Sequence, residues 1–126
     1  MELNYDFVRE ILIDYAESKN VSGPTVIELL DFAKTKNKTY DELAFSLARM
    51  YEGNLISDSP ILIGNHYKIV SPGNLTWQGN EYLSSIRSQN IWSETKSKIK
   101  KIGSKVTFET IVSVASAIAK HQLGLS

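Results

Sequence analysis

Few residues of this 126-residue chain have a type and spacing suited to catalysis or metal binding. The two imidazoles, His66 and His121, stand far apart, and neither has a carboxylate at metal-ligand spacing. There is no cysteine, which excludes thiol nucleophiles, zinc ribbons and disulfide frameworks. No glycine-rich phosphate loop occurs, and no serine lies in a nucleophile elbow. The sequence therefore predicts a protein that is not an enzyme and that binds no metal or cofactor.

Contact with nucleic acid is the next chemistry that the residues suggest. A recognition helix reads the major groove with its N-terminal residues, and residues 40–52 are the candidate. The expected contacts to double-stranded DNA come from this helix, the lysines before it and a hairpin after it: Lys34, Lys36, Lys38, Tyr40, Ser46, Arg49, His66 and Lys68. Against this, the helix carries three acids and a single base, a poor surface for a polyanion. The alternative is that these lysines are solvated and that the acids stabilise the helix N-terminus.

Charge is unevenly distributed, although the net charge is zero. Residues 1–60 hold eleven acids and six bases, whereas residues 61–126 hold three acids and eight bases. The most basic stretch contains Lys96, Lys98, Lys100, Lys101 and Lys105. This basic patch suits nucleic acid or an acidic protein, or it is the solvated face of an amphipathic helix. The asymmetry itself is equally compatible with two ends of a neutral protein that attract each other.

Apolar residues at helical spacing predict the elements that would position these side chains. The expected helices cover about 4–19, 25–36, 40–52, 76–86 and 91–102, and a last one starts after Thr107. Residues 25–28 and 39–42 each form a capping box, and a short strand at the start of 25–36 is the alternative there. Gly-Asn at 64–65, between β-type residues, predicts a hairpin.

Individual residues add expectations about packing. Gly53 is expected to end the third helix in a left-handed conformation, and Gly79 to allow close approach of the first helix or the hairpin. Burial is expected for the large apolar side chains on helix faces, namely Leu12, Leu47, Trp77, Leu83 and Trp92.

The order helix, helix, helix, hairpin, helix is that of a winged helix. Leu75-Thr76-Trp77-Gln78-Gly79-Asn80-Glu81-Tyr82-Leu83, then Ile91-Trp92 and a lysine-rich helix, then Thr107-Phe108-Glu109 and Gln122-Leu123-Gly124-Leu125, resembles a YjcQ-like family of small phage and prophage proteins. The resemblance implies a phage-associated context and brings no activity or site residues. We expect a mainly α fold with a small β-hairpin (α+β): a winged helix-turn-helix over 1–90, with two appended helices over 91–126 packed on it as one compact domain.

Two functions from different classes follow from this expectation. One is a DNA-binding or regulatory protein, and the other is an adaptor that modulates or inhibits a host (defence) protein. No apolar run is long enough to cross a bilayer and the start lacks signal-peptide features, so a soluble cytoplasmic protein is expected. A homodimer is a further expectation, formed through Ile111, Val114, Ala115 and Ile118, and the alternative is that the last helix packs wholly within one chain.

Overall fold

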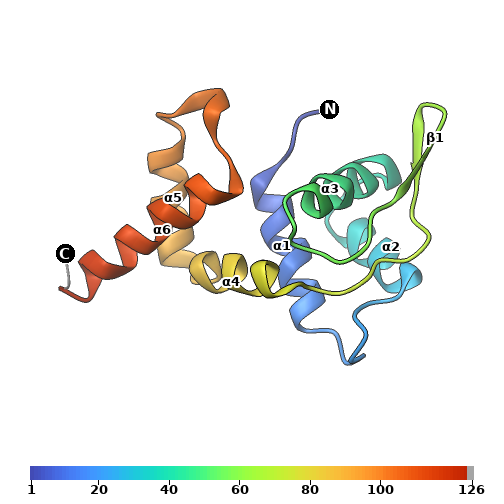
Figure 1. Cartoon of the computed structure of the whole chain (residues 1–126), viewed down its shortest axis with the longest axis horizontal. Helices are drawn as coiled ribbons and strands as arrows, with labels where there is room; N and C mark the ends of the chain where they lie inside the picture. Colours follow the sequence, from blue (N-terminus) through green and yellow to red (C-terminus); the bar gives the residue numbers. More distant parts are fainter. Residues whose placement is uncertain (125–126) are drawn as a thin grey trace. The chain divides into compact units, whose positions relative to one another are not determined.

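The computed structural model describes residues 1–124, with the side chain of Ser104 excepted. Over these residues the chain forms six α-helices, one short 3-10 helix and one antiparallel hairpin (Figure 1). The elements are α1 (Tyr5–Ala16), α2 (Val26–Thr35), α3 (Tyr40–Glu52), β1 (Ile61–Ile63), β2 (His66–Lys68), α4 (Trp77–Ile86), α5 (Gln89–Ile99), η1 (Gly103–Lys105) and α6 (Phe108–Gln122). The expected mainly α class with a small β-hairpin is confirmed.

The chain divides into two compact units within α4. Unit 1 is Met1–Asn80 and unit 2 is Glu81–Ser126. Unit 1 contains α1, α2, α3 and the hairpin, and unit 2 contains α5 and α6. Each unit is described by itself below.

Side-chain caps start the first three helices. Asn4 Oδ1 accepts from the Phe7 amide at 3.0 Å and opens α1. Thr25 and Thr39 open α2 and α3 with complete capping boxes, in which Glu28 and Glu42 accept from the cap amides. The predicted boxes are therefore confirmed, and residues 26–35 are helix from the first turn rather than strand.

The end of α3 differs from the expectation. Gly53 has a φ of −82°, and the left-handed residue is Asn54, with a φ of +63°. The amides of Asn54 and Leu55 donate to the carbonyls of Tyr51 and Met50, each at 2.9 Å, which is the Schellman arrangement. Asparagine tolerates this conformation better than other residues with a side chain, so the glycine was not needed there.

The hairpin forms where the Gly-Asn turn predicts it. Ile61 pairs with Lys68, Leu62 with Tyr67 and Ile63 with His66. Because side chains alternate along a strand, Leu62 and Tyr67 share one face of the hairpin and the other two pairs share the opposite face. Ile56 forms an isolated bridge with Leu75, which closes the loop that contains the hairpin.

The core of unit 1 joins α1, α2 and α3. Its buried side chains include Phe7, Ile11, Leu12, Leu29, Leu43, Leu47 and Met50. The expected burial of Leu12 and Leu47 is confirmed, but that of Trp77 is wrong, because its side chain is 79% exposed. The buried Ile86 lies nine positions after Trp77, about two and a half helical turns, so the two lie on opposite sides of α4.

Gly79 confirms the expected close approach but has a different neighbour. A Cβ at this position would collide with the carbonyl group of Leu55, which is neither in the first helix nor in the hairpin. The Leu55 carbonyl also accepts from the Thr76 amide at 3.1 Å, and Thr76 caps α4 as predicted, through its hydroxyl and the Gly79 amide at 2.9 Å. The segment after α3 is thereby fixed to the start of α4.

Unit 2 is built on the packing of α5 against α6. Trp92, Thr95 and Ile99 are buried on α5, and Ile111, Ala115 and Ile118 are buried on α6. The expected roles of Trp92 and Leu83 in the core are confirmed. Helix α5 starts at Gln89 with Ser88 as its cap and stops at Ile99, so the expected extension to Ile102 is wrong and Ile102 is exposed.

Candidate functional site

The hairpin and α3 form one surface of unit 1, which we call the wing surface (residues 40, 41, 49 and 61–68). The Ile69 amide donates to the Tyr40 hydroxyl at 2.8 Å. One guanidinium nitrogen of Arg49 lies 3.5 Å from the Tyr67 hydroxyl, and His66 Nδ1 lies 3.8 Å from Asp41. Tyr40, Arg49 and His66 therefore all take part in contacts between α3 and the hairpin segment, and Lys68 lies on the same hairpin.

Arg49 is committed to contacts inside unit 1. Its Nη1 lies 2.8 Å from the Glu52 carboxylate, and its guanidinium lies 5.3 Å from the centre of the Phe45 ring. These contacts neutralise the one base of α3 and partly cover its side chain. A base-reading arginine needs a free planar face of donors, so the geometry weighs against the expected role of Arg49.

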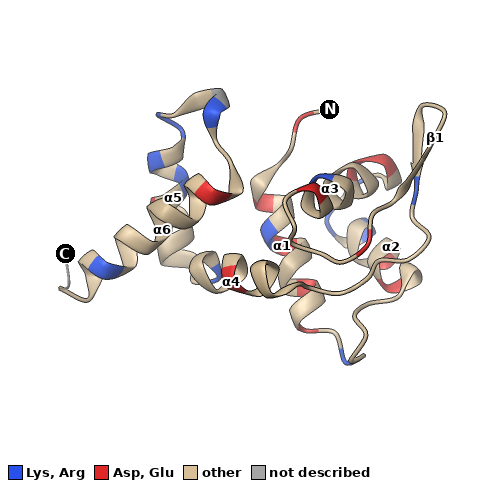
Figure 2. Ribbon diagram, in the orientation of Figure 1, with Lys and Arg blue, Asp and Glu red and all other residues tan. Residues whose placement is uncertain are grey.

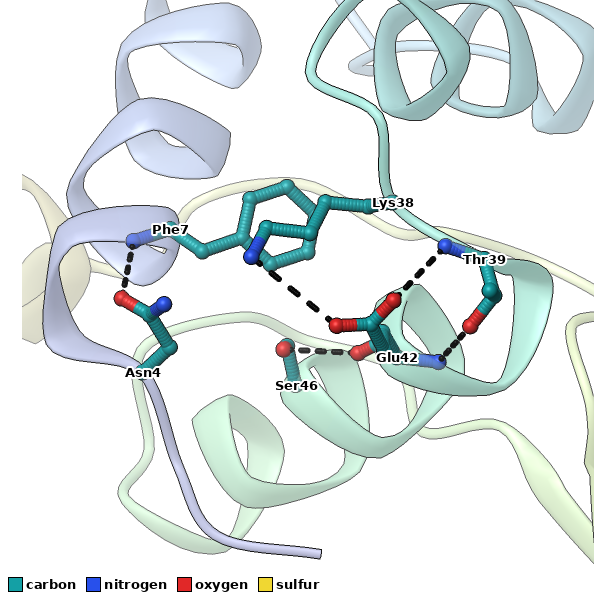
Figure 3. Close-up of polar contacts among 6 residues, drawn as sticks. All are labelled: Asn4, Phe7, Lys38, Thr39, Glu42 and Ser46. Carbon is teal, nitrogen blue, oxygen red and sulfur yellow. Dashed lines mark hydrogen bonds and ion pairs between the residues drawn. The ribbon is translucent and has the colours of Figure 1, made fainter.

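Two of the three lysines before α3 are also paired with acids. Lys36 Nζ lies 2.9 Å from Glu10. Lys38 Nζ lies 3.9 Å from Glu42, and Figure 3 shows this second pair. Both ammonium groups also lie over aromatic rings, 5.9 Å from Phe32 for Lys36 and 5.3 Å from Phe7 for Lys38. Lys34 is exposed on α2. The lysines thus tie elements of unit 1 together and leave little excess positive charge for a phosphate backbone.

Ser46 is not available to a partner, and the expectation that it reads DNA is wrong. Its side chain is only 3% exposed, and its hydroxyl donates to the Glu42 carbonyl at 2.8 Å (Figure 3). It follows Leu43 by three residues and precedes Met50 by four, so helical periodicity places it on the face that packs into the core. The helical spacing of Ser46 relative to Leu43 and Met50 is evident in the sequence, but a polar residue such as serine is normally expected on the surface.

The hairpin presents apolar side chains that the site prediction omitted. Ile61, Leu62 and Ile63 are 52%, 60% and 59% exposed. Three consecutive apolar residues in a strand, without alternation, normally mark a strand covered on both faces, but here each of the three side chains of β1 stays more than half exposed. The run of three apolar residues at 61–63 is the sequence feature that indicates this apolar surface.

The lysines of unit 2 differ from those of unit 1. Lys98, Lys100, Lys101 and Lys105, here called the basic segment, are all exposed. Lys96, the fifth member of the expected patch, is half-buried with its ammonium 5.8 Å from the Trp92 ring centre. Figure 2 shows the blue segments gathered at the end of α5 and along the chain that leads to α6.

The residues expected at a dimer interface are mostly inside the chain. Ile111, Ala115 and Ile118 are buried, and only Val114 keeps partial exposure. The expectation that these three residues meet a second subunit is therefore wrong. The apolar stripe of α6 serves the packing against α5, which was the alternative.

A polar hollow lies among the loops of unit 1. Its volume is about 960 Å³, and it is lined by residues 19–25, 57–58 and 71–74. Its polar groups bind one another: Asn74 donates to the Val21 carbonyl at 2.8 Å, and Ser71 to Asp58 at 2.9 Å. These contacts hold the loops together.

Two broader features complete the description of residues 1–124. Over this range, no three His, Cys, Asp or Glu side chains gather closely enough to hold a metal ion. No helix among these residues has the length and apolar character needed to cross a membrane.

Comparison with known proteins assigns the chain to a protein family. A sequence model of the family described as "Hypothetical protein (DUF2513)" matches residues 2–105. A protein of Haemophilus influenzae, named only as uncharacterized, is 24% identical over 123 residues, which cover 98% of this chain and 99% of the relative. No solved structure matches the chain. Because the family model covers most of its length, the chain belongs to the DUF2513 family.

Proposed function

We propose that unit 1 is a winged helix whose hairpin binds another protein, and that the molecule is an adaptor rather than an enzyme. One observation carries the proposal: three consecutive apolar side chains, Ile61, Leu62 and Ile63, stand exposed on an edge strand. Natural proteins protect such strands with charge, proline or a covering element, because an apolar edge invites pairing with another chain. An exposed apolar edge therefore favours a binding surface.

Contacts within unit 1 order the hairpin in the absence of a partner. The bond from the Ile69 amide to Tyr40 fixes the end of β2, and the contact between Arg49 and Tyr67 fixes the face toward α3. A strand that is already ordered loses little conformational entropy on binding. The outer edge of β1 offers backbone groups for strand addition, while Ile61 and Ile63 offer apolar contacts on one face.

The surroundings of the hairpin indicate the chemistry of the partner. Asp41, Glu42 and Glu52 make α3 acidic despite Arg49, as the red segments of this helix in Figure 2 show. Asp41 and Glu52 are exposed. An extended apolar segment flanked by lysine or arginine complements this surface, because rim charges of opposite sign speed association and fix register. The resemblance to YjcQ-like phage and prophage proteins supports a host protein as the source of that segment.

DNA recognition by α3 and the hairpin is the second candidate. The order of the elements and the exposed Lys34 and Lys68 favour it. The acids of α3 and the engaged Arg49 weigh against it, because phosphate neutralisation supplies most non-specific affinity. We therefore rank protein binding first for unit 1.

Site-specific photo-crosslinking tests the proposal. A benzophenone amino acid replaces Ile63 in one sample and Ile27, which is exposed on α2, in a matched control. In cells that carry the gene, we expect the Ile63 probe alone to crosslink one defined protein. The purified partner should bind the natural chain, and Ile61→Ser with Ile63→Ser should weaken binding at least about tenfold, since each lost apolar contact costs about 1 kcal/mol or more. Equal crosslinking from both positions, or full affinity of the double variant, contradicts the proposal.

A further inference from the structure

The basic segment of unit 2 is the strongest unassigned feature of the described chain. Unit 2 holds seven Lys and Arg against three Asp and Glu, whereas unit 1 holds seven against eleven. Lys98, Lys100, Lys101 and Lys105 lie within eight residues, and no acid occurs between Glu94 and Glu109. Positive charge is therefore concentrated where α5 ends and the chain turns toward α6.

These lysines are free to meet a partner. Within residues 1–124, none of the four makes an ion pair, while Lys36, Lys38 and Arg49 of unit 1 all do. The packing of α5 explains their exposure, because Trp92, Thr95 and Ile99 occupy the buried side of that helix. Gly103, with a φ of +73°, then turns the chain and leads it to Lys105.

Compensation of the α5 helix dipole does not account for all the lysines of the basic segment. Lysines in the last turn of a helix compensate the negative end of its dipole, and Lys96 and Lys98 occupy that turn. Lys100 and Lys101 follow the last residue of α5 directly and share this effect, but Lys105 lies six positions beyond that residue, and the dipole effect falls off within one turn. The excess of exposed lysines has no partner in the described part of the chain.

We propose that the basic segment binds the phosphate backbone of a nucleic acid duplex, independently of base sequence. Four ammonium groups without aromatic neighbours among them suit a backbone of closely spaced phosphates and not the stacked bases of a single strand. An acidic protein is less well matched, because protein interfaces depend on apolar anchors. Ile102 is the one exposed large apolar side chain among the four lysines. This inference concerns unit 2 and does not depend on the wing surface.

Fluorescence anisotropy of the full chain with a labelled random-sequence duplex tests the proposal. With four phosphate contacts, affinity should fall roughly a hundredfold between 50 and 200 mM salt, a slope of about −3.6 in log units. Replacing Lys98, Lys100, Lys101 and Lys105 by Gln should abolish most of this binding. The control replaces Lys19, Lys34 and Lys68 of unit 1 by Gln; all three are exposed and make no ion pair among residues 1–124, so this loss of three charges should change affinity less than about threefold.

Further measurements distinguish a loss of binding from a loss of folding and define the results that overturn the proposal. Circular dichroism checks the fold, and a milder variant, Lys100→Gln with Lys101→Gln, should reduce the salt slope by about 2. Absence of duplex binding at low salt, or loss of binding in the unit 1 control and not in the unit 2 variant, overturns the proposal. Binding to polyglutamate but not to the duplex overturns it in favour of an acidic protein. A single strand bound more tightly than the duplex contradicts the duplex form.

Discussion

The backbone amide of Ile69, directly after β2, donates a 2.8 Å hydrogen bond to the hydroxyl of Tyr40, the first residue of α3. The two residues are 29 positions apart, so this bond fixes the hairpin to the helix across a long loop. Ile69 is buried, and its amide would lack a partner inside the protein without the phenol. The position of the wing surface therefore depends on a tyrosine that the sequence suggests for DNA contact.

Tyr40→Phe should release the hairpin without disturbing the core. Loss of one hydrogen bond costs about 0.5–1.5 kcal/mol, and the low end is expected because Tyr40 is partly exposed and water can replace the phenol. Chemical denaturation measures the free energy of unfolding, and hydrogen exchange reports the Ile69 amide. Tyr51→Phe, another exposed tyrosine of α3, is the control and should change neither measurement. Unchanged exchange at Ile69 in Tyr40→Phe contradicts the role of the bond.

Gly79→Ala tests the contact between the start of α4 and the segment after α3. Alanine normally favours a helix over glycine by about 1 kcal/mol. At this position, however, the new Cβ collides with the Leu55 carbonyl, whose carbon would lie only 2.9 Å away. A net destabilisation of roughly 1–3 kcal/mol is expected, as for other overpacked sites.

Calorimetry or denaturation of Gly79→Ala beside Gln78→Ala separates the two effects. Gln78 is the exposed neighbour on the same turn of α4, so its replacement should be nearly neutral. A stabilised Gly79→Ala protein would mean that α4 and Leu55 can separate at little cost.

Local signals in the sequence predicted most of the elements. The capping boxes at Thr25 and Thr39 and the Gly-Asn turn at 64–65 depend on contacts within a few residues, and all three are present. The residue with left-handed backbone at the end of α3 is Asn54 and not Gly53. Glycine and asparagine both tolerate this conformation, so the sequence alone does not show which of the two neighbours adopts it.

The candidate site was harder to predict because it depends on pairing across the chain. The ion pair between Lys36 and Glu10 joins two helices that only tertiary packing brings together. The sequence shows a lysine near a possible recognition helix, and nothing local shows that the lysine is already neutralised. The same holds for Ile111 on α6, whose partner helix α5 decides whether its face is core or interface.

Leu47 and Trp77 form a contrasting pair for a test of the core. Leu47→Ala should cost roughly 2–5 kcal/mol, because the side chain is fully enclosed between helices. Trp77→Ala should change stability by less than about 0.5 kcal/mol, although tryptophan is the larger residue, because its side chain is in solvent. Urea denaturation of the two variants gives both values, and the reverse order contradicts the packing described for unit 1.

Asp14 and Glu42 should give opposite pH dependences of stability. Burial, reinforced by the charges of Glu28 and Glu17, raises the pKa of Asp14 above its ordinary 3.8. The folded state thus holds this proton more tightly than the unfolded chain does, so the contribution of Asp14 to stability falls as pH rises through the raised pKa. Asp14→Asn should therefore increase the melting temperature at pH 7, and the gain should vanish at acid pH, where both proteins are uncharged at this position.

Glu42 supplies the control with the opposite sign. Its hydrogen bond from the Thr39 amide lowers the pKa of its carboxyl below the ordinary 4.5. Its stabilising contribution is therefore complete above the pKa of the unfolded chain and is lost as pH falls through the lowered value. Glu42→Gln should reduce the melting temperature at pH 7 and differ less from the natural chain in acid. Melting temperatures across the acid range test both signs, and a pH-independent gain in Asp14→Asn would mean that the substitution acts through packing rather than through the charge.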